Sequence, residues 1–287
     1  AMLMFLRLLF FLVFVAKADV VTWLGKLGGV ARGVEVAYFS EATGGRGLKC
    51  ATNIQRDEAV LRVPMSVVMS GAAARDELRA PHLGDADAIA LLLLAEKKKG
   101  NASRWAPYVA TLPTEVTTLK TMTDDELEWL QDDALQAKGK LERQRLRDAF
   151  EGLQASKSGG KVSQSFEDYL WARSLVDSRA LTFKGARYLA PVADFVNYAP
   201  MPEERQADAG NFFLKYHTLD ADSLRVFADR DCRPGDQYLE DYGDNPNAIY
   251  LEYHGFVPDT PNPFDCVSLA DFLAPLLKEE EEEEEEK

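Results

Sequence analysis

Cysteine and histidine are both scarce in this chain of 287 residues, which has three of each. The cysteines are odd in number and form no Cys-x-x-Cys motif, so we expect neither a disulfide framework nor a structural zinc site. The histidines include no pair at the spacing of two ligands on one helix turn, which argues against any metal site. The six residues are Cys50, Cys232, Cys266, His82, His217 and His254.

An excess of basic residues is also lacking. The chain has 33 Lys and Arg against 47 Asp and Glu, a net charge of -14. The last ten residues, 278–287, contain eight Glu and two Lys, which leaves -8 on the other 277 residues. A mildly acidic body argues against binding to DNA or RNA phosphates. Because the run from Glu279 to Glu286 repels itself and buries nothing, we expect a disordered acidic tail without a specific function.

The sequence has no apolar run long enough for a membrane span, which needs about 20 residues. Residues 2–16 come nearest, with Arg7 ahead of the run Leu8 to Ala16 and small residues at Ala16 and Ala18. This pattern predicts a cleavable leader over 1–18, with the mature chain beginning near Asp19 and holding no membrane span. A mis-started gene model and a buried N-terminal helix are the alternatives. The compartment stays open: a secretory route or a plastid with the leader, the cytoplasm without it.

What is present is the composition of a globular protein, with 46% hydrophobic and 28% charged residues. This length allows one large or two small domains and a sizeable core. The first part of the body is β-rich. Its predicted elements are a helix over 20–30 ended by Gly28-Gly29, strands over 34–39, 48–51 and 59–63, and a glycine turn over 43–47.

The middle of the chain is helical, and the last part returns to β structure. A capping box at Thr123 to Glu126 opens one helix, and Lys97 to Lys99 suit the end of another. The predicted helices cover 87–99, 123–130, 138–154 and 165–178, with a break at 158–160. After them come an apolar segment over 188–196, paired strands over 211–216 and 223–228, a turn over 234–236, a strand over 237–241 and a short helix over 247–254.

Three short motifs could carry chemistry. They are the glycine turn Gly44 to Gly47, the segment Asp194 to Tyr198, and the pair Tyr242-Gly243. Each has an ordinary structural interpretation when taken alone: a hairpin, a packed strand end and a packed tyrosine. Their order along the chain, together with three further segments, is far more specific.

The sequence resembles the SET-domain methyltransferases, in the branch that includes the Rubisco large-subunit lysine methyltransferase. The resemblance covers about residues 30–260. It rests on GGRGLKCATNI (44–54), VLRVPMSVVMS (60–70), RWAPYVATLP (104–113), YLWARSLVDSRAL (169–181), LAPVADFVNYAP (189–200) and DQYLEDYGDNPNAIYLEYHGF (236–256).

This resemblance implies an α+β fold of small curled β-sheets, with a C-terminal pseudoknot and a mainly helical insertion. Chains are seldom threaded in this way. The implied organisation is a leader (1–18), an N-terminal helix (19–32), a SET domain (33–243) with its insertion at about 71–165, a truncated post-core segment (244–277) and the acidic tail (278–287).

The resemblance also implies S-adenosylmethionine as the cofactor and assigns roles to residues that match the family's motifs. Glycine lets the first loop approach a ligand closely, and Arg46 can donate to the cofactor carboxylate. The implied cofactor-binding residues are Gly44, Gly45, Arg46, Gly47, Ser178, Asn197, Tyr198, Tyr242 and His254. The implied substrate-binding residues are Arg179, Leu181 and Asp194. No residue is assigned to a metal.

Tyr242 matches the family's site tyrosine and is the candidate catalytic residue. Methyl transfer from a sulfonium to an amine is an in-line displacement, so the site must align nitrogen, methyl carbon and sulfur and keep the amine deprotonated. A tyrosine hydroxyl and carbonyl oxygens can orient the amine and the polarised methyl group. Aromatic faces attract cationic groups.

The chain departs from the family pattern in three places. Tyr198 replaces a histidine that contacts the cofactor, and His254 stands where a tyrosine precedes the Gly-Phe pair. Because adjacent helical residues point about 100° apart, Tyr253 cannot replace that tyrosine, so we expect His254 to face the site. A helix-capping, solvent-facing His254 is the alternative. The helical C-terminal domain of the family is nearly absent.

We therefore expect an S-adenosylmethionine-dependent methyltransferase that acts on a lysine of a non-histone protein, as a monomer without a nucleic-acid partner. Two alternatives stand beside it: a catalytically degenerate SET-domain binding module, and a protein-histidine methyltransferase.

Overall fold

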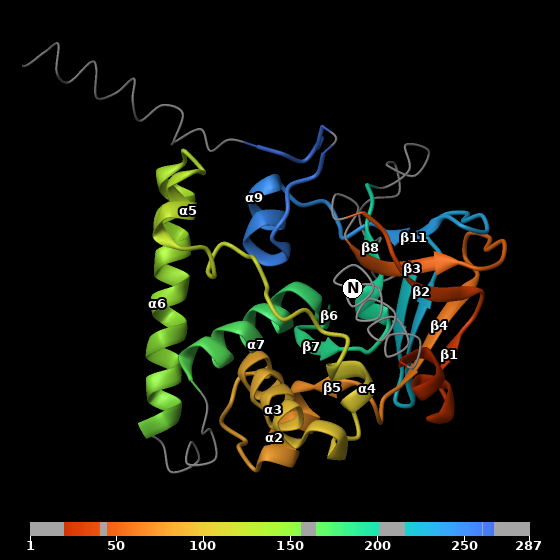
Figure 1. Ribbon diagram of the computed structural model, residues 1–287, viewed down its shortest axis with the longest axis horizontal. Helices are drawn as coiled ribbons and strands as arrows, with labels where there is room; N and C mark the ends of the chain where they lie inside the picture. Colours follow the sequence, from red (N-terminus) through yellow and green to blue (C-terminus); the bar gives the residue numbers. More distant parts are fainter. Residues whose placement is uncertain (1–19, 41–44, 156–164, 201–215, 260, 267–287) are drawn as a thin grey trace, which may run out of the picture.

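The computed structural model describes residues 20–40, 45–155, 165–200, 216–259 and 261–266. Strands gather on one side of the molecule and helices on the other, with α7 (Phe166–Arg179) reaching between them (Figure 1). Five predictions lie outside the described residues. They concern the leader, Gly44, the break at 158–160, most of the strand at 211–216, and the acidic tail.

The first sheet forms the base of the β side. Its inner strand β4 is mostly buried, with Val60, Leu61 and Val63 in the core and Arg62 only partly covered. All its pairs are antiparallel. The strand predicted over 223–228 is present as β10, and it pairs with β9, which begins just after the segment 211–216 that was predicted to be its partner. The strands, in spatial order, are β1 (Val30–Ala31), β4 (Ala59–Pro64), β10 (Ser223–Phe227) and β9 (His217–Leu219).

The second sheet brings together the motifs predicted to carry chemistry. Its spatial order is β2 (Val34–Tyr38), β3 (Arg46–Cys50), β11 (Gln237–Glu240) and β8 (Asn197–Tyr198). β11 is antiparallel to β3 and parallel to β8, with Leu239 opposite Asn197 and Glu240 opposite Tyr198. Segments far apart in the sequence therefore lie side by side, with Tyr242 just beyond the end of β11.

A small third sheet joins the helical insertion to the site. Its spatial order is β5 (Met69–Ser70), β7 (Ala186–Leu189) and β6 (Leu181–Phe183). The segment predicted to be apolar over 188–196 is largely buried, and only its first two residues belong to a strand, because β7 ends at Leu189. Pro191 has no N–H for a strand ladder, and the chain then turns at Val192 into the 3-10 turn η4 (Ala193–Phe195).

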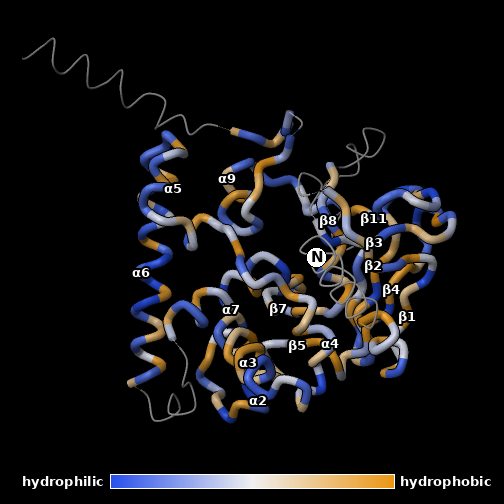
Figure 2. The backbone as a smooth tube through the Cα atoms, in the orientation of Figure 1, coloured by the Kyte–Doolittle hydropathy of each residue, from blue (hydrophilic) through white to orange (hydrophobic). Residues whose placement is uncertain are grey.

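The insertion is helical, as predicted. α3 buries a continuous apolar run, Leu91 to Leu94, and appears largely orange in Figure 2, whereas α6 is mainly blue. The predicted capping box is present: Thr123 and Glu126 bond each other's backbone N–H groups. The helices are α2 (Gly71–Leu78), α3 (Asp85–Lys99), η2 (Gly100–Ala102), α4 (Ala106–Val109), α5 (Asp124–Glu128) and α6 (Asp133–Ala155).

Both ends of the described chain differ a little from prediction. The N-terminal helix is confirmed but shorter, over 20–26, because Gly28 takes a positive φ of 83° before β1 begins. The C-terminal helix is confirmed over 247–254 as α9 (Asn247–Ile249) followed by a π-helical turn, η6 (Tyr250–His254). Within the described ranges, no helix is long and apolar enough to cross a membrane, and no cluster of potential metal ligands occurs.

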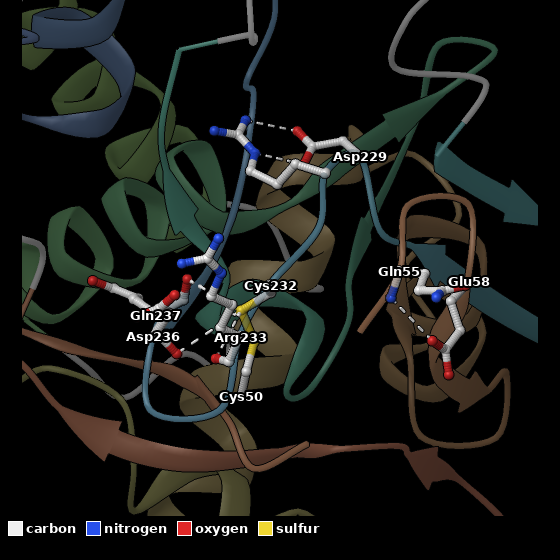
Figure 3. The surroundings of a disulfide bond; sticks show 9 residues. Cys50, Gln55, Glu58, Asp229, Cys232, Arg233, Asp236 and Gln237 are labelled. Atoms are coloured by element: carbon white, nitrogen blue, oxygen red, sulfur yellow. Dashed lines mark hydrogen bonds and ion pairs between the residues drawn. A yellow bond between two sulfur atoms is a disulfide. The ribbon is translucent and has the colours of Figure 1, made fainter. Parts of the chain in front are cut away.

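One disulfide is present, which corrects the expectation drawn from cysteine number. Cys50 ends β3, and Cys232 lies in the connection that leads to β11; their Cα atoms are 6.4 Å apart (Figure 3). An odd count of cysteines does not prevent one pair, and Cys266 is left exposed. The pairing of β3 with β11 brings the two cysteines together, although 182 residues separate them in sequence.

Candidate active site

Tyr242 lies at the centre of the predicted site, two residues after the end of β11. Its hydroxyl donates a hydrogen bond of 2.6 Å to the carbonyl oxygen of Val196, which immediately precedes β8. Burial raises the pKa of Tyr242 above its usual value, and the charge of Glu240 adds to this effect. The phenol therefore stays protonated at neutral pH. Since its proton is held by Val196, its oxygen can act toward a further group as an acceptor.

An aromatic cluster surrounds this hydroxyl. We use that name for Tyr198, Tyr242, Tyr250, His254 and Phe256. The ring of Tyr198 lies 5.6 Å from Tyr242, 4.9 Å from Tyr250 and 5.4 Å from Phe256, measured between ring centroids. The sequence analysis identified three of the five residues. Tyr250 and Phe256 were missed, although both fall within the matched segment 236–256 and their aromatic character was the available signal.

His254 faces the cluster, and its solvent-facing alternative is wrong. Its ring centroid lies 4.9 Å from that of Tyr242, and its Nδ1 lies 3.1 Å from the carbonyl oxygen of Ser178. A carbonyl only accepts, so Nδ1 carries the proton in the neutral ring and Nε2 presents a lone pair. Burial lowers the pKa of His254, the charge of Arg179 lowers it further, and the bond to Ser178 opposes both.

Ser178 contributes its main chain to this arrangement. Its hydroxyl donates to the carbonyl of Leu175 at 3.3 Å, within its own helix, while its carbonyl oxygen meets His254. The predicted contact of Ser178 with a cofactor stays a prediction.

A charged cluster forms around Asp194, which lies two residues before Val196 in the sequence. Arg179 donates to the carbonyl oxygen of Asp194 at 2.9 Å, and its Nη1 lies 3.6 Å from the carboxylate. Tyr108, which the sequence analysis missed, donates to the same carboxylate at 3.0 Å. Burial raises the pKa of Asp194, although the charges of Arg179 and Arg46 oppose this.

Arg46 completes the charged cluster from β3. Its guanidinium lies 3.8 Å above the ring of Phe195 and donates to the carbonyl oxygen of Thr111. Burial and the neighbouring charge of Arg179 lower the pKa of Arg46 to about 10, while Asp194 acts in the opposite direction. Two buried atoms here have no hydrogen-bond partner among the described residues: Nε of Arg46 and Oδ1 of Asp194.

The backbone beside Asp194 is strained. Val192 has a φ of 71° and a ψ of −38° while its side chain is fully buried. A β-branched residue is an outlier at positive φ, and such strain persists only where the surrounding structure enforces it. The turn delivers Asp194 and Phe195 to the charged cluster through η4.

The glycine turn meets Asn197 closely. A Cβ atom at Gly47 would lie 2.8 Å from Nδ2 of Asn197 and 2.6 Å from Nε2 of Gln237, so only glycine fits there without displacement. Asn197 donates to the carbonyl oxygen of Arg46 at 3.0 Å, and Gly45 has a φ of 63°. Leu181 is the predicted site residue that stands apart: it opens β6 opposite Tyr188 and packs on the core.

The fold that holds these residues is shared with solved methyltransferase structures. The chain superposes on the SET domain of LSMT bound to MeLysine and AdoHcy with a TM-score of 0.73 and 19% identity. It superposes on Rubisco LSMT bound to AdoMet with a TM-score of 0.71 and 18% identity. Each match covers 85% of this chain and 57% of the other. This chain has the SET-domain fold.

Sequence comparison finds relatives that are named for a different substrate residue, histidine. The SET-domain chain is 29% identical to the actin-histidine N-methyltransferase of Homo sapiens and 28% identical to that of Mus musculus. Both matches cover 84% of this chain and 42% of the relative, so the chain spans less than half of either enzyme. No family model matches the sequence.

The fold prediction made from six ordered motifs is thereby confirmed. The SET domain has small sheets with a mainly helical insertion between them, and β11 runs parallel to β8, which contains Tyr198. The helical insertion begins at α2, as predicted, and α7 returns the chain to the site. The substitution of Tyr198 leaves the β8–β11 pairing in place, because that pairing uses main-chain atoms alone.

Proposed function

We propose that this SET domain is an S-adenosylmethionine-dependent protein N-methyltransferase, and that its acceptor is the side-chain amine of a lysine in a non-histone protein. The observation that carries the proposal is the joint placement of a neutral Tyr242 hydroxyl, an aromatic cluster and a charged cluster around Val196. The likeness to LSMT structures with AdoMet or AdoHcy supports the same conclusion.

The charged cluster fits the amino-acid end of the cofactor. Nε of Arg46 is a buried donor and Oδ1 of Asp194 a buried acceptor, both without hydrogen-bond partners in the described structure. The cofactor's carboxylate and ammonium groups would satisfy such a donor and acceptor. Gly47 keeps the loop free of a side chain beside Asn197, which suits a close approach of backbone to ligand. We assign Arg46, Asn197 and the glycine turn to cofactor binding on these grounds.

When bound, the cofactor supplies an electrophilic methyl group on a sulfonium. The acceptor nitrogen must offer a lone pair, so it must reach the site without its extra proton; the new N–CH₃ bond forms as the S–CH₃ bond breaks. The Tyr242 oxygen, whose proton is held by Val196, can accept from the amine or from a polarised methyl C–H. The faces of Tyr198, Tyr250 and Phe256 favour the cations of the reaction, which are the sulfonium of the cofactor and the methylated ammonium that forms.

A histidine acceptor is the second candidate, and the sequence relatives favour it. Those relatives are named as actin-histidine methyltransferases and are 28–29% identical to this chain. The LSMT structure bound to methyl-lysine is 19% identical to it. Both named substrates, actin and Rubisco, are non-histone proteins, which supports the non-histone part of the proposal. We take the chain to act as a monomer.

The deciding experiment is methyl transfer from labelled cofactor into a cell lysate, followed by acid hydrolysis and separation of the methylated amino acids. Labelled methyl-lysine is the expected product. Labelled methyl-histidine would assign the second candidate. Saturable cofactor binding by calorimetry, without any label transferred by the wild type above a Tyr242→Phe control, would instead identify a binding module.

A further inference from the structure

The π-helical turn η6 carries His254 into the aromatic cluster, and its other side docks on the helical insertion. Leu251 packs with Leu119 and Leu127 in a small apolar cluster. Oε2 of Glu252 lies 2.5 Å from Nζ of Lys138. The turn is thus held by side chains of the insertion, which also contacts the charged cluster through Tyr108 and Thr111.

Tyr253 and Gly255 also lie against the helical insertion. Lys120 places its Nζ 5.7 Å from the ring centroid of Tyr253. Gly255 follows at a φ of 77°, so close to the insertion that an added Cβ would lie 1.7 Å from the carbonyl oxygen of Thr117. Of residues 251–255, His254 is the one that points to Ser178 and Tyr242.

Lys120 is unusual for a lysine because only 5% of its side chain is exposed. Its Nζ lies 2.6 Å from Oδ2 of Asp177, a carboxylate exposed to 6%. Asp177 immediately precedes Ser178, whose carbonyl oxygen accepts from His254. The Lys120 ammonium therefore pairs with the residue before Ser178, at the end of α7, and also lies within 5.7 Å of the ring centroid of Tyr253, the residue before His254.

The carboxylate does not depend on Lys120 alone. Nη1 of Arg187 bonds Oδ1 of Asp177, and Nη2 of Arg173 lies 3.7 Å from Oδ2. Although burial by itself would raise the pKa of Asp177, the charges of Arg173, Lys120 and Arg187 together lower it. Loss of Lys120 would leave Asp177 paired, so the usual penalty for stranding a buried charge would not apply.

We propose that Lys120 is a positioning residue for the methyl-transfer site: by joining Asp177 at the end of α7 to Tyr253 on η6, it fixes the orientation in which His254 faces Tyr242. The inference rests on the proposed function for its catalytic consequence, but the positioning itself can be measured without turnover. Lys120 touches neither Tyr242 nor the charged cluster, so it acts through His254.

The test is Lys120→Met, followed by NMR titration of the histidine ring protons, with His254 assigned by its loss in His254→Gln. Exposed His82 serves as an internal reference. In the wild type the His254 resonance should titrate below its ordinary range. In Lys120→Met the ring should gain access to water and its pKa should rise, while Lys120→Arg keeps the wild-type titration. The rate of methyl transfer should fall about tenfold in Lys120→Met, with cofactor affinity within about twofold of wild type.

Lys97→Met is the matched control, because Lys97 also places its ammonium over a ring, 3.8 Å from the centroid of Trp171, but away from the site. It should leave the His254 titration unchanged. An unchanged His254 titration in folded Lys120→Met would overturn the proposal. If Lys120→Met does not fold, Tyr253→Leu replaces it with the same criterion. If the wild type transfers no methyl group, the proposed function fails, and the titration still decides the positioning role.

Discussion

The two sides of the proposed active site, one assigned to the cofactor and one to the acceptor, are held in different ways. On the cofactor side, β3, β11 and β8 are joined by main-chain pairing, for example Leu48 with Tyr238 and Glu240 with Tyr198. On the acceptor side, residues 251–255 are held by side chains of the insertion and by one close approach of backbone.

This difference between main-chain pairing and side-chain contacts indicates where substitutions should be tolerated. A main-chain ladder does not depend on side-chain identity, so Tyr198 can replace a histidine without moving β8. A turn whose position depends on particular side chains should shift when one of those side chains is replaced. We therefore expect the cofactor side to tolerate changes outside its charged cluster and the acceptor side to be sensitive throughout.

The largest effect is expected at Gly255, where the acceptor side meets Thr117. Gly255→Ala combines a positive φ of 77° with a Cβ that would lie 1.7 Å from a carbonyl oxygen, so the turn must shift. We expect a loss of about 3–4 kcal/mol in the free energy of unfolding, measured by urea denaturation.

Gly235→Ala is the control on the cofactor side. Gly235 has a φ of 94° and no atom within 4 Å of an added Cβ, so it isolates the conformational cost, about 1–2 kcal/mol. Equal losses at the two glycines would show that the close approach to Thr117 does not matter for stability.

The next effect is at Tyr242, where the two halves meet. Tyr242→Phe keeps the ring but removes the oxygen, so the rate of methyl transfer should fall by about 100-fold while cofactor affinity changes by less than about twofold. Tyr169→Phe is the matched control, because its hydroxyl also makes a 2.6 Å hydrogen bond, to Asp87, away from the site. It should change stability and leave transfer intact. A parallel loss of binding and transfer in Tyr242→Phe would make Tyr242 a structural residue.

A smaller effect is expected in the charged cluster. Arg46→Ala and Asn197→Ala should each weaken S-adenosylmethionine binding by about 1–3 kcal/mol, read by calorimetry, because each removes a polar group that we assign to the cofactor. Arg225→Ala removes an exposed arginine that pairs with Asp220 on the same side and should leave affinity unchanged. Wild-type affinity in both site variants would place the cofactor elsewhere.

The smallest effect concerns pH. Because burial and Arg179 lower the pKa of His254 below about 6.5, the imidazole is neutral at pH 7 and gains a proton only as the pH falls. The new charge would repel Arg179 and a cationic cofactor, so activity should be lost toward acid. His254→Tyr should retain activity and lack this step.

The measurement is the ratio of wild-type to His254→Tyr activity across pH. Below the pKa of His254, the ratio should fall by roughly tenfold per pH unit. Burial, with the charges of Asp244 and Asp229, raises the pKa of Asp241 to about 6, despite the N–H of Gly243. Both proteins contain Asp241, so its titration cancels in the ratio. Superimposable profiles would remove His254 from the site.

The sequence predicted what local pattern and motif order determine. The capping box of α5, the strand at β2 and the helix over 247–254 follow from short-range signals, and the convergence of Asn197, Tyr198 and Tyr242 follows from motifs in family order. Contacts between segments far apart in the sequence could not be predicted from these patterns. The Cys50–Cys232 pair and the burial of Lys120 depend on which strands and helices become neighbours.

Two further misses have a physical reason as well. Val192 takes a backbone conformation that its side chain disfavours, so no propensity rule could predict the turn within the apolar segment 188–196. Tyr250 and Phe256 look like ordinary core residues in the sequence, and only their rings' approach to Tyr198 gives them a place in the site.

The disulfide described above also makes the protein a covalent ring. Cys50 and Cys232 are separated by 182 residues, and that interval contains the whole helical insertion, with Lys120 and α7. A single protease cut anywhere inside the ring therefore cannot release a fragment while the bond is intact. Under non-reducing conditions the nicked protein would still migrate as one molecule, and only a reductant would separate its two pieces.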